Sequence, residues 1–405
     1  MDSYDAVVVG ASIGGCTAAR LLAQAGARVA LVDRSPDPEA YKTVCTHYIQ
    51  PSATPTIERL GLASLIEERG GVRNGVELWT PYSGWVMPPD GIPYGYNITR
   101  KALDPMLRRL TADTPGVEYM PGLNVVGVTR NGRVTGVDVE NQARDRRKLS
   151  ARLVVGADGR DSSVASLAEV PGKVKPHRRF FYWAYWTGVE PGRTRSRMWM
   201  LDPDFAYLFP NEGGQTIVLT APHESRLAEF RADLEGAYVR DIARLPDAPD
   251  LSGGTRMSKV LGKLRLPNVM RRAAQPGLAL VGDAALASDP LWGVGCGWAF
   301  QSAEWLADAV APALVGSGDL DSALARYAKQ HRRRLGPHHF LIADLASGRK
   351  ANPFERAMYR AAARDETVFR AFEGIGSRRR SPMTLFDPRV LARIARSGIA
   401  VRDRG

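Results

Sequence analysis

A strand–turn–helix–strand pattern at the start of this chain restricts its fold more than any other stretch. The apolar run Tyr4–Val9 is typical of a buried strand, and the glycine-rich turn Gly10–Gly15 follows it at once. Residues Cys16–Ala25 have the spacing of a helix, and a second apolar run, Val29–Val32, ends at Asp33. This order is typical of a βαβ unit, whose two strands are parallel. We therefore predict an α/β fold built on a parallel sheet.

The glycine-rich turn carries the residue types that a dinucleotide site requires. Gly10 permits the tight turn, Gly15 lets the helix approach the strand, and the helix N-terminus can receive a pyrophosphate. Ser12 replaces the middle glycine of the usual motif, and its hydroxyl can donate to phosphate. Asp33 lies about 20 residues beyond the turn, where an acid binds ribose hydroxyls. The predicted nucleotide-binding residues are Gly10, Ser12, Ile13, Gly14, Gly15, Asp33 and Arg34.

A second glycine-rich stretch, late in the chain, points to a flavin. The apolar strand Leu278–Val281 ends at Gly282-Asp283, and Pro290 then breaks the chain before Gly293–Gly295 and a helix. An acid can bind a polyol hydroxyl, glycines let backbone N–H groups approach a flat ring, and a helix N-terminus carries about half a positive charge. A flavin needs all three, because its ribityl chain has hydroxyls and its reduced ring carries negative charge. The alternative is a glycine-rich loop capped by an acid, as in many α/β proteins.

A corner of the same kind lies in the middle of the chain. The apolar strand Leu153–Gly156 ends in Ala157-Asp158-Gly159. A flavin site at Gly282-Asp283 needs a counterpart elsewhere in the chain, and this second Gly/Asp corner provides it. We therefore expect the separated segments to converge around one flavin nucleotide.

The remaining pattern predicts an inserted domain and a helical end. Short aromatic-rich strands such as Phe180–Val189 favour an antiparallel sheet, and Glu224–Leu245 has the pattern of one amphipathic helix. The pattern of the nucleotide-binding fold stops before these strands and resumes at Leu278, which implies an inserted substrate domain. Beyond Leu320 the pattern is helical and basic, and we expect this region to pack on the first domain. The predicted spans are 1–72, 97–179 and 269–330 for a Rossmann-like nucleotide-binding domain, 73–96 and 180–268 for an antiparallel-sheet substrate domain, and 331–405 for the helical C-terminal region.

Composition argues against several other classes of protein. The net charge is +12, but the arginines are spread over the chain without a nucleic-acid-binding motif, so we predict no nucleic-acid partner. The three cysteines are odd in number and lack metal-ligand spacing, so we expect neither a metal site nor a disulfide framework. No apolar run is long enough to span a membrane, and no basic segment precedes the first strand, so we expect a cytoplasmic protein.

Several motifs follow one another in a recognisable order. They are Gly10-Ala11-Ser12-Ile13-Gly14-Gly15 with Asp33, Arg100 in NITRKALDPML, Asp158-Gly159 in VVGADGRDSSV, and Gly282-Asp283 with Pro290, Gly293 and Gly295. This set resembles the flavoprotein monooxygenases of the para-hydroxybenzoate hydroxylase type, whose superfamily includes geranylgeranyl reductases, squalene epoxidases and flavin-dependent halogenases. The resemblance implies FAD as cofactor and NADPH or NADH as electron donor. It also implies that Arg100 contacts FAD, Asp283 the ribityl chain, and Asp158 the corner where NAD(P)H passes.

The chain departs from this family pattern at several positions. Ala165 stands where the second motif usually has arginine, which puts the usual nicotinamide docking in doubt. Leu286 replaces the histidine that commonly follows the Gly-Asp motif, and the tail PLWGVGCGWAFQSA is closer to the reductase, epoxidase and halogenase branches. The segment Phe205–Pro210 lacks both tryptophans of the halogenase motif, which disfavours a halogenase.

The leading functional hypothesis is oxygen insertion. Reduced FAD reacts with dioxygen to form a flavin C4a-hydroperoxide, which transfers one oxygen atom to an apolar aromatic or polyene natural-product intermediate. The alternatives are a flavin-dependent reductase of a prenyl-like alkene, a flavin-dependent halogenase, and a non-redox cyclase that keeps FAD as a scaffold. A separate flavin reductase is the alternative electron donor, and the sequence leaves the oligomeric state open.

The candidate catalytic residues are those expected beside the flavin ring. They are Pro290, Gly293, Val294 and Gly295, which would wall and cradle the ring, and His47 as an acid or base. A plain hydrogen-bonded loop histidine is the simpler interpretation of His47. The candidate substrate contacts are Trp183, Tyr185, Trp199 and Tyr207, with ordinary core positions as the alternative. Cys45 is interpreted as an inert buried thiol in preference to a covalent flavin anchor.

Overall fold

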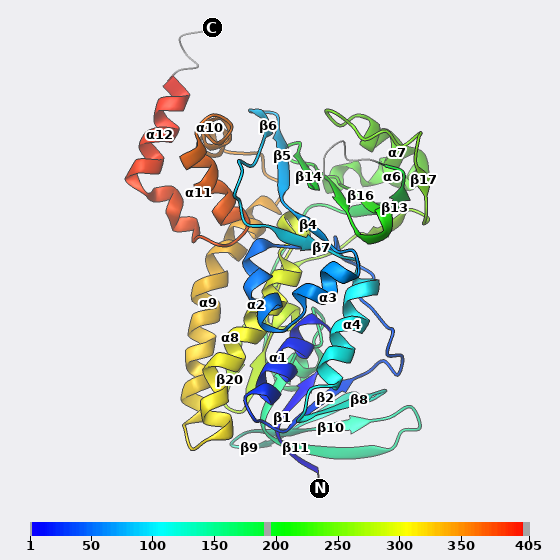
Figure 1. The fold of residues 1–405 in the computed structure, drawn as a ribbon, viewed down its shortest axis with the longest axis vertical. Helices are drawn as coiled ribbons and strands as arrows, with labels where there is room; N and C mark the ends of the chain where they lie inside the picture. The colour runs from blue at the N-terminus through cyan, green and yellow to red at the C-terminus, as the bar shows by residue number, and fades with distance from the viewer. Residues whose placement is uncertain (1, 190–195, 400–405) are drawn as a thin grey trace.

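The computed structural model describes residues 2–189 and 196–399, and a sheet with parallel central strands lies at one end of the molecule (Figure 1). Strand β1 (Asp2–Val9) pairs in parallel with β2 (Val29–Asp33) on one side and with β11 (Arg146–Gly156) on the other. Strand β8 (Val117–Pro121) continues the sheet beside β2, and β21 (Leu278–Leu280) continues it beside β11. Strands from distant parts of the chain therefore end at the same edge of one sheet.

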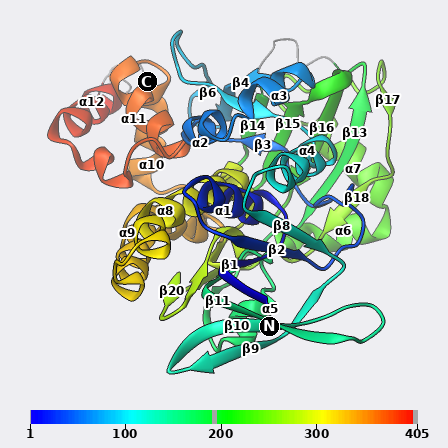
Figure 2. The ribbon, with the colours of Figure 1, turned by 60° about the horizontal axis from the view of Figure 1, so that its bottom comes forward.

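Antiparallel strands and packed helices complete this first unit. The added strands are β9 (Asn124–Asn131), β10 (Arg133–Glu140) and β20 (Ala274–Gln275). The packed helices, in spatial order, are α4 (Arg100–Ala112), α1 (Ile13–Gln24), α8 (Gly295–Val315) and α9 (Leu320–Leu345) (Figure 2). Val7, Val8 and Leu31 are fully buried, as is typical of parallel strands covered on both faces.

A second, mostly antiparallel sheet lies at the other end of the molecule (Figure 1). Its strands are β5 (Val76–Thr80), β6 (Gly84–Val86), β13 (Phe181–Thr187), β14 (Ser196–Met200), β15 (Phe205–Pro210), β16 (Gln215–Ala221), β17 (Thr255–Arg256) and β18 (Leu261–Lys263). Alternation along these strands divides their side chains between two cores. Trp183 and Tyr207 belong to the core shared with the first sheet, whereas Trp186 and Trp199 pack in a separate core.

The predicted single helix over Glu224–Leu245 is wrong. The structure has two helices there, α6 (Leu227–Ala232) and α7 (Leu234–Ala243). Asp233 separates them, because its φ of −153° and ψ of 83° are not helical. Its carboxylate accepts the Gly236 N–H at 2.9 Å and so caps α7. An N-capping aspartate inside an amphipathic pattern leaves the periodicity intact while it breaks the helix.

Smaller elements join the two units and form the C-terminal region. They are β3 (Tyr48–Ile49), β4 (Val72–Asn74), β7 (Gly95–Asn97), β12 (Gly172–Lys175), β19 (Asn268–Arg271), β22 (Leu286–Ala287), α2 (Thr54–Arg59), α3 (Ala63–Glu68), α5 (Ser163–Leu167), α10 (Pro353–Ala362), α11 (Glu366–Gly376) and α12 (Pro388–Ile399). Helix α9 packs on the first unit as expected, but α10–α12 lie at the end that holds the second sheet (Figure 1).

The predicted fold class is confirmed: the chain is α/β, with a Rossmann-like sheet, a second antiparallel sheet and a helical C-terminal region. The exact domain boundaries stay a prediction. Residue 1, and the parts of the predicted spans at 190–195 and 400–405, lie outside the described residues.

Replacing Gly15 by Ala should destabilise the fold strongly. A Cβ at this position would overlap the Gly10 carbonyl oxygen, and neither the Cβ nor this backbone oxygen can rotate away. We expect a loss of more than about 3 kcal/mol in the free energy of unfolding, measured by denaturant titration. Gly376→Ala is the matched control, because a Cβ there meets nothing within 4 Å. Equal stabilities of the two variants would contradict the close packing of the turn.

Candidate cofactor site and adjoining cavity

The corners at the ends of β1, β11 and β21 lie against one another. A Cβ at Gly10 would come within 2.6 Å of the Ala157 carbonyl oxygen, so the first two corners touch through backbone. A Cβ at Gly14 would lie 3.3 Å from a methyl of Val281, at the end of the third strand. Three stretches far apart in the sequence therefore meet around the start of α1.

The N-termini of α1 and α8 differ from those of the other long helices. Neither has a side-chain cap, and neither has an acid in its first turn. By contrast, α4, α7, α9, α10 and α11 each begin with a residue whose side chain accepts a backbone N–H. The positive ends of α1 and α8 are thus left without a side-chain acceptor, which suits an anionic ligand.

Arg100 lies beside the uncapped start of α1. Its guanidinium is buried and makes bonds of 2.8 and 2.9 Å to the two oxygens of Asp104. The Nη2 atom of Arg100 also donates to the Ser12 hydroxyl, at 2.6 Å. Burial alone would lower the pKa of Arg100, but Asp104, Cys296 and Cys45 together outweigh it and the pKa is raised. Arg100 therefore remains charged beneath the glycine turn.

The predicted acids Asp33 and Asp158 already accept hydrogen bonds from their own corners. Asp33 accepts the N–H groups of Ala11 at 2.6 Å and Ser35 at 2.8 Å. Asp158 accepts the Ser162 hydroxyl at 2.5 Å and the Val164 N–H at 3.0 Å, so it caps the start of α5. Both carboxylates therefore shape the backbone of the site.

The third predicted acid, Asp283, has a partner that the sequence did not indicate. Lys42 Nζ lies 2.8 Å from Asp283 Oδ2, and it comes from the segment after β2. Burial raises the pKa of Asp283, but Lys42, Arg160 and Arg100 together outweigh burial and the net pKa is lowered. No motif marks Lys42, because a lysine in an irregular segment carries no periodic signal. The pair joins the segment after β2 to the turn after β21.

The predicted ring cradle is a short 3-10 turn, Pro290–Trp292, followed by Gly293 with a φ of +61°. Gly293 cannot carry a side chain, because its Cβ would come within 2.7 Å of the Tyr48 ring. Tyr207 Oη donates to the Leu291 carbonyl at 2.6 Å. Gly293 and Val294 are buried, whereas Gly295 is exposed at the start of α8. Gly295 is therefore the cradle residue that a ligand can reach from outside.

His47 is buried at the junction between the two sheets, with a positive φ of 65°. Its Nδ1 accepts the backbone N–H of Arg100 at 3.1 Å, so the proton of the neutral ring lies on Nε2. Nε2 lies 2.6 Å from the hydroxyl of Tyr185, to which it then donates. His47 is thus hydrogen-bonded to both α4 and β13, and its role as an acid or base stays a prediction.

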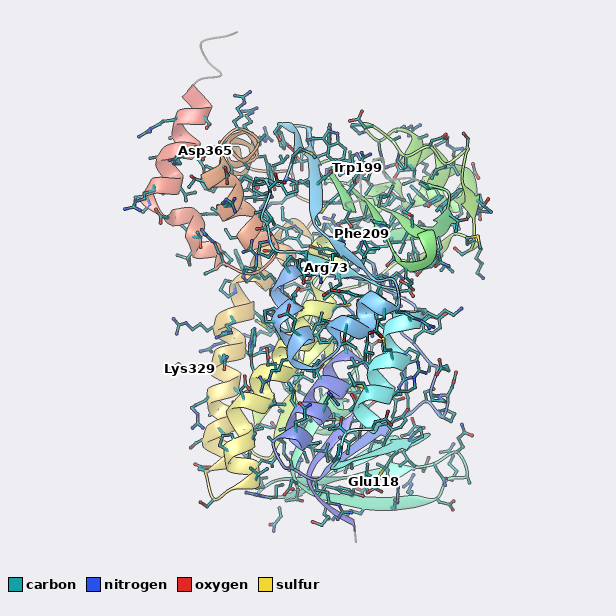
Figure 3. The ribbon with its side chains drawn as sticks, in the orientation of Figure 1. Arg73, Glu118, Trp199, Phe209, Lys329 and Asp365 are labelled. Carbon is teal, nitrogen blue, oxygen red and sulfur yellow. The ribbon has the colours of Figure 1, made fainter. Side chains whose placement is uncertain are left out.

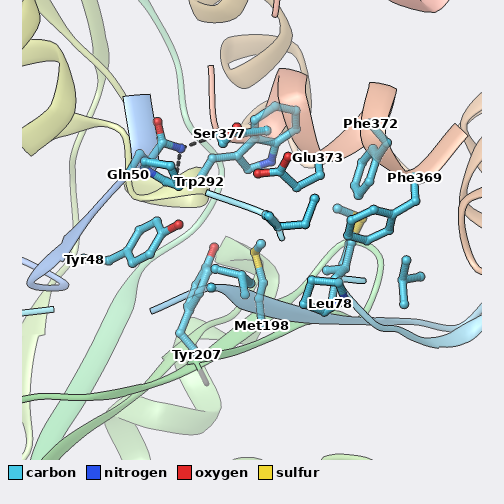
Figure 4. Close-up of a pocket in the computed structure, with 18 of the residues that line it drawn as sticks. Tyr48, Gln50, Leu78, Met198, Tyr207, Trp292, Phe369, Phe372, Glu373 and Ser377 are labelled. Carbon is cyan, nitrogen blue, oxygen red and sulfur yellow. Dashed lines mark hydrogen bonds between the residues drawn. The ribbon is translucent and has the colours of Figure 1, made fainter. Parts of the chain in front are cut away.

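An apolar cavity of about 850 Å³, including its open mouth, adjoins the cradle (Figure 4). The lining comes from the cradle, the second sheet and α11, and includes Tyr48, Leu78, Met198, Tyr207, Phe209, Leu291, Trp292, Phe369 and Phe372. Gln50, Glu373 and Ser377 gather at the side nearest Trp292 (Figure 4). The sequence indicated no role for α11 here, because helical periodicity does not say what a helix faces.

The four predicted substrate contacts lie in different places. Tyr207 lines the cavity. Trp183 and Tyr185 lie on the same side of the sheet as the first core, and Tyr185 contacts His47. Trp199 lies on the opposite side, where its indole donates to the Pro246 carbonyl at 2.8 Å and packs against Trp85. Figure 3 labels Trp199 within this sheet and Phe209 nearer the first sheet. Trp199 therefore does not line the cavity.

Comparison with known proteins identifies the family of this chain and several proteins that are similar to it. A family described as FAD binding domain matches residues 3–336. The menaquinone reductase of Mycolicibacterium smegmatis is 26% identical over 352 residues, covering 82% of this chain and 81% of the relative. The flavin-dependent brominase Bmp2 superposes with a TM-score of 0.78 at 17% identity, covering 99% of this chain and 98% of that chain. The p-nitrophenol 4-monooxygenase PnpA of Pseudomonas putida DLL-E4 superposes with a TM-score of 0.77 at 20% identity, covering 94% and 100%. At these identities the two structures show a shared fold.

Within residues 2–189 and 196–399, no helix combines the length and the apolar character that crossing a membrane requires.

Replacing Tyr207 by Phe should destabilise the loop at Leu291. The change removes a hydroxyl donor from a fully buried carbonyl, and we expect a loss of about 1–3 kcal/mol in the free energy of unfolding. Denaturant titration measures the loss. Tyr182→Phe is the matched control, because the Tyr182 ring stacks on Phe230 and its hydroxyl makes no hydrogen bond within the described chain. The hypothesis fails if both variants unfold at the same denaturant concentration.

Replacing Asp283 by Asn should lower stability near neutral pH and have little effect in acid. The pKa of Asp283 is lower in the folded chain than its ordinary value, because Lys42, with Arg160 and Arg100, outweighs burial. Such a group adds stability above its ordinary pKa of about 4 and loses that contribution as the pH falls below it. The gap in melting temperature between D283N and the wild type should therefore shrink below about pH 4. A gap that stays constant through acid would show that the ion pair is not its cause.

Proposed function

This chain belongs to the FAD-binding-domain family, and on that premise we propose that it is an FAD-dependent monooxygenase acting on an apolar aromatic or polyene molecule. The observation that carries the proposal is the apolar cavity, which adjoins the glycine loop at the uncapped N-terminus of α8. An oxygenase needs such a site, because its substrate must lie beside the cofactor in a place that water does not fill.

The residues of the candidate site fit FAD in chemistry. The uncapped start of α1 and the charge of Arg100 suit the pyrophosphate, and Asp33 suits the adenosine ribose. Arg34, which is exposed beside Asp33, is proposed to contact the same end of the nucleotide. Asp283 suits the ribityl hydroxyls, and the start of α8 suits the negative charge of the reduced ring.

In the proposed reaction, the chain's own residues hold the flavin ring in position and limit the access of water. FAD, when bound, supplies the chemistry that activates dioxygen. The Tyr207 hydroxyl and the Gln50 amide hold the carbonyl groups of Leu291 and Trp292, so the loop that cradles the ring is fixed in advance. The carbon-rich walls of the cavity offer water few hydrogen-bond partners beside the reacting face.

The polar groups at one side of the cavity are proposed to orient the substrate. Gln50, Glu373 and Ser377 gather near Trp292, while the remaining wall is mainly apolar (Figure 4). Glu373 pairs with Arg379, so it offers a fixed carboxylate. A substrate with one hydroxyl or carbonyl on an apolar skeleton would match this division.

NADPH or NADH is the proposed electron donor, with a separate flavin reductase as the alternative. The alternative rests on the corner of Asp158. Both oxygens of that carboxylate already accept hydrogen bonds, and Ala165 provides no charge for a nicotinamide nucleotide. The arginines at this corner, Arg160 and Arg271, already donate to backbone carbonyl groups.

A second candidate is a flavin-dependent reductase of a prenyl-like alkene. It is favoured by the menaquinone reductase of M. smegmatis, which covers 82% of this chain. The same apolar cavity would hold an isoprenoid chain. The two candidates differ in whether dioxygen is consumed.

The proposal predicts that the purified protein retains FAD and couples dioxygen uptake to substrate. With NADPH, NADH or chemically reduced flavin as donor, uptake should rise when an aromatic or polyene substrate is added, as followed with an oxygen electrode. Met198→Trp should raise KM or abolish coupling while FAD stays bound, because Met198 lines the cavity. Met383→Trp is the control, because Met383 is 65% exposed.

Other outcomes discriminate between the candidates. Turnover under argon with reduced flavin would favour the reductase, and product formation under argon with oxidised FAD would favour a non-redox cyclase. Halide-dependent halogenated product would favour a halogenase. A protein that binds no flavin would refute the whole proposal.

A further inference from the structure

Two thiols from distant parts of the chain touch at the start of α8. Cys45 lies in the irregular segment between β2 and β3, and Cys296 is the second residue of α8. Their Sγ atoms are 3.6 Å apart, although 251 positions separate them in sequence. No disulfide joins them in the structure. The remaining cysteine, Cys16, lies fully buried within α1.

Donors and positive charge surround this pair. The backbone N–H of His47 donates to Cys45 Sγ at 3.2 Å. Arg100 Nη1 lies 3.9 Å from Cys296 Sγ. Cys296 also lies in the first turn of α8, where neither an acid nor a cap offsets the helix dipole. These are the surroundings that stabilise a thiolate.

The two thiols differ in how readily they ionise. A hydrogen bond from Cys296 is the main cause that lowers the pKa of Cys45 well below its ordinary value, and His47 and Arg100 act in the same direction. The same hydrogen bond, together with burial, raises the pKa of Cys296. Cys45 is half-buried, whereas Cys296 is only 6% exposed. The pair thus combines a reachable nucleophile with a protonated thiol held beside it.

We propose that Cys45 and Cys296 form a redox-active dithiol that reduces a peroxide and is oxidised to an intramolecular disulfide. Hydrogen peroxide is released when a flavin that activates dioxygen fails to transfer its oxygen, so the role in the cell rests on the proposed function. The thiols adjoin Gly295, the reachable residue of the proposed flavin cradle. They are therefore placed to meet the peroxide where it forms.

The reaction balances without a further reactant. The Cys45 thiolate attacks one peroxide oxygen, the O–O bond breaks, and the leaving hydroxide takes up the proton that Cys45 released, which gives water and a sulfenic acid. Cys296 sulfur then attacks Cys45 Sγ, the S–O bond breaks, and the hydroxide leaves as water with the proton of Cys296. Two thiols and one peroxide thus yield one disulfide and two waters, with two electrons passing from sulfur to oxygen.

The geometry permits this bond with a small movement. The Sγ–Sγ distance must shorten from 3.6 Å to about 2.05 Å. Residues 34–47 form no helix or strand, so Cys45 can approach Cys296 without breaking a regular element. Cys16 provides an internal comparison, because burial raises its pKa to about 12 and neither of the other thiols is bonded to it.

The test is direct mass spectrometry of the purified, FAD-loaded protein. The protein is reduced, freed of reductant, treated with hydrogen peroxide, alkylated and digested. We expect the peptides of Cys45 and Cys296 to be joined with the loss of two hydrogens, while Cys16 is recovered alkylated. Recovery of Cys45 and Cys296 as separate alkylated or over-oxidised peptides would overturn the proposal.

Single variants separate the two roles. In Cys296→Ser, Cys45 should accumulate as a sulfenic acid that dimedone traps. In Cys45→Ser no disulfide can form, and Cys296 should be recovered as a thiol, because it is only 6% exposed to the peroxide. Without peroxide, Cys45 in the wild type should react with iodoacetamide at least ~10-fold faster than Cys16 near neutral pH. Equal reactivity of Cys45 and Cys16, in a protein whose circular dichroism shows it folded, would also overturn the proposal.

The source of the peroxide distinguishes this proposal from the proposed function. Added hydrogen peroxide tests the dithiol alone, since no turnover is involved. Reduced flavin with dioxygen and no substrate tests whether the enzyme makes the peroxide itself, with catalase as the control. A disulfide formed by added peroxide but not during flavin oxidation would support the dithiol and count against the oxygenase.

Discussion

The parallel pairing of β1 with β11, and of β11 with β21, is the constraint on which the rest of this structure depends. Parallel strands end at the same edge of a sheet, so this pairing brings the corners at Gly10, Asp158 and Gly282 together. The contact is made through backbone, since a side chain on Gly10 or Gly15 would overlap a carbonyl oxygen. Helices α1 and α8 then start from this edge and present uncapped N-termini to the same region.

The buried charge of Arg100 ties this edge to the rest of the site. Its guanidinium is held by Asp104, touches Ser12 in the glycine turn, and lies near the Cys296 thiol, while its backbone N–H binds His47. A buried guanidinium without its carboxylate would be costly, so the Asp104 pair is what permits a positive charge here. The start of α4 therefore places a positive charge at the proposed pyrophosphate site, orients His47 and stabilises the Cys45 thiolate.

The cavity depends on a different set of contacts, which join the C-terminal helices to the cradle. Gln50 donates to the carbonyl groups of Trp292 and Gly376, and it accepts from Arg378 at 2.5 Å. These bonds place α11 over the cradle, so Phe369 and Phe372 complete the apolar wall. The proposed oxygenase and its reductase alternative both use this wall. The thiol pair lies on the side of the cradle where α8 begins.

The sequence by itself determined the features that are local. Apolar runs, glycine turns and terminal acids predicted the Rossmann-like sheet, the flavin-type corners and the inserted antiparallel sheet, because each depends on residues close together in the chain. Tertiary structure alone decided which side chains meet. Lys42 pairs with Asp283, Cys45 touches Cys296, and Trp199 turns away from the cavity. Periodicity fixes which face of an element is apolar, but the partner of that face depends on contacts between residues hundreds of positions apart, and these leave no local pattern.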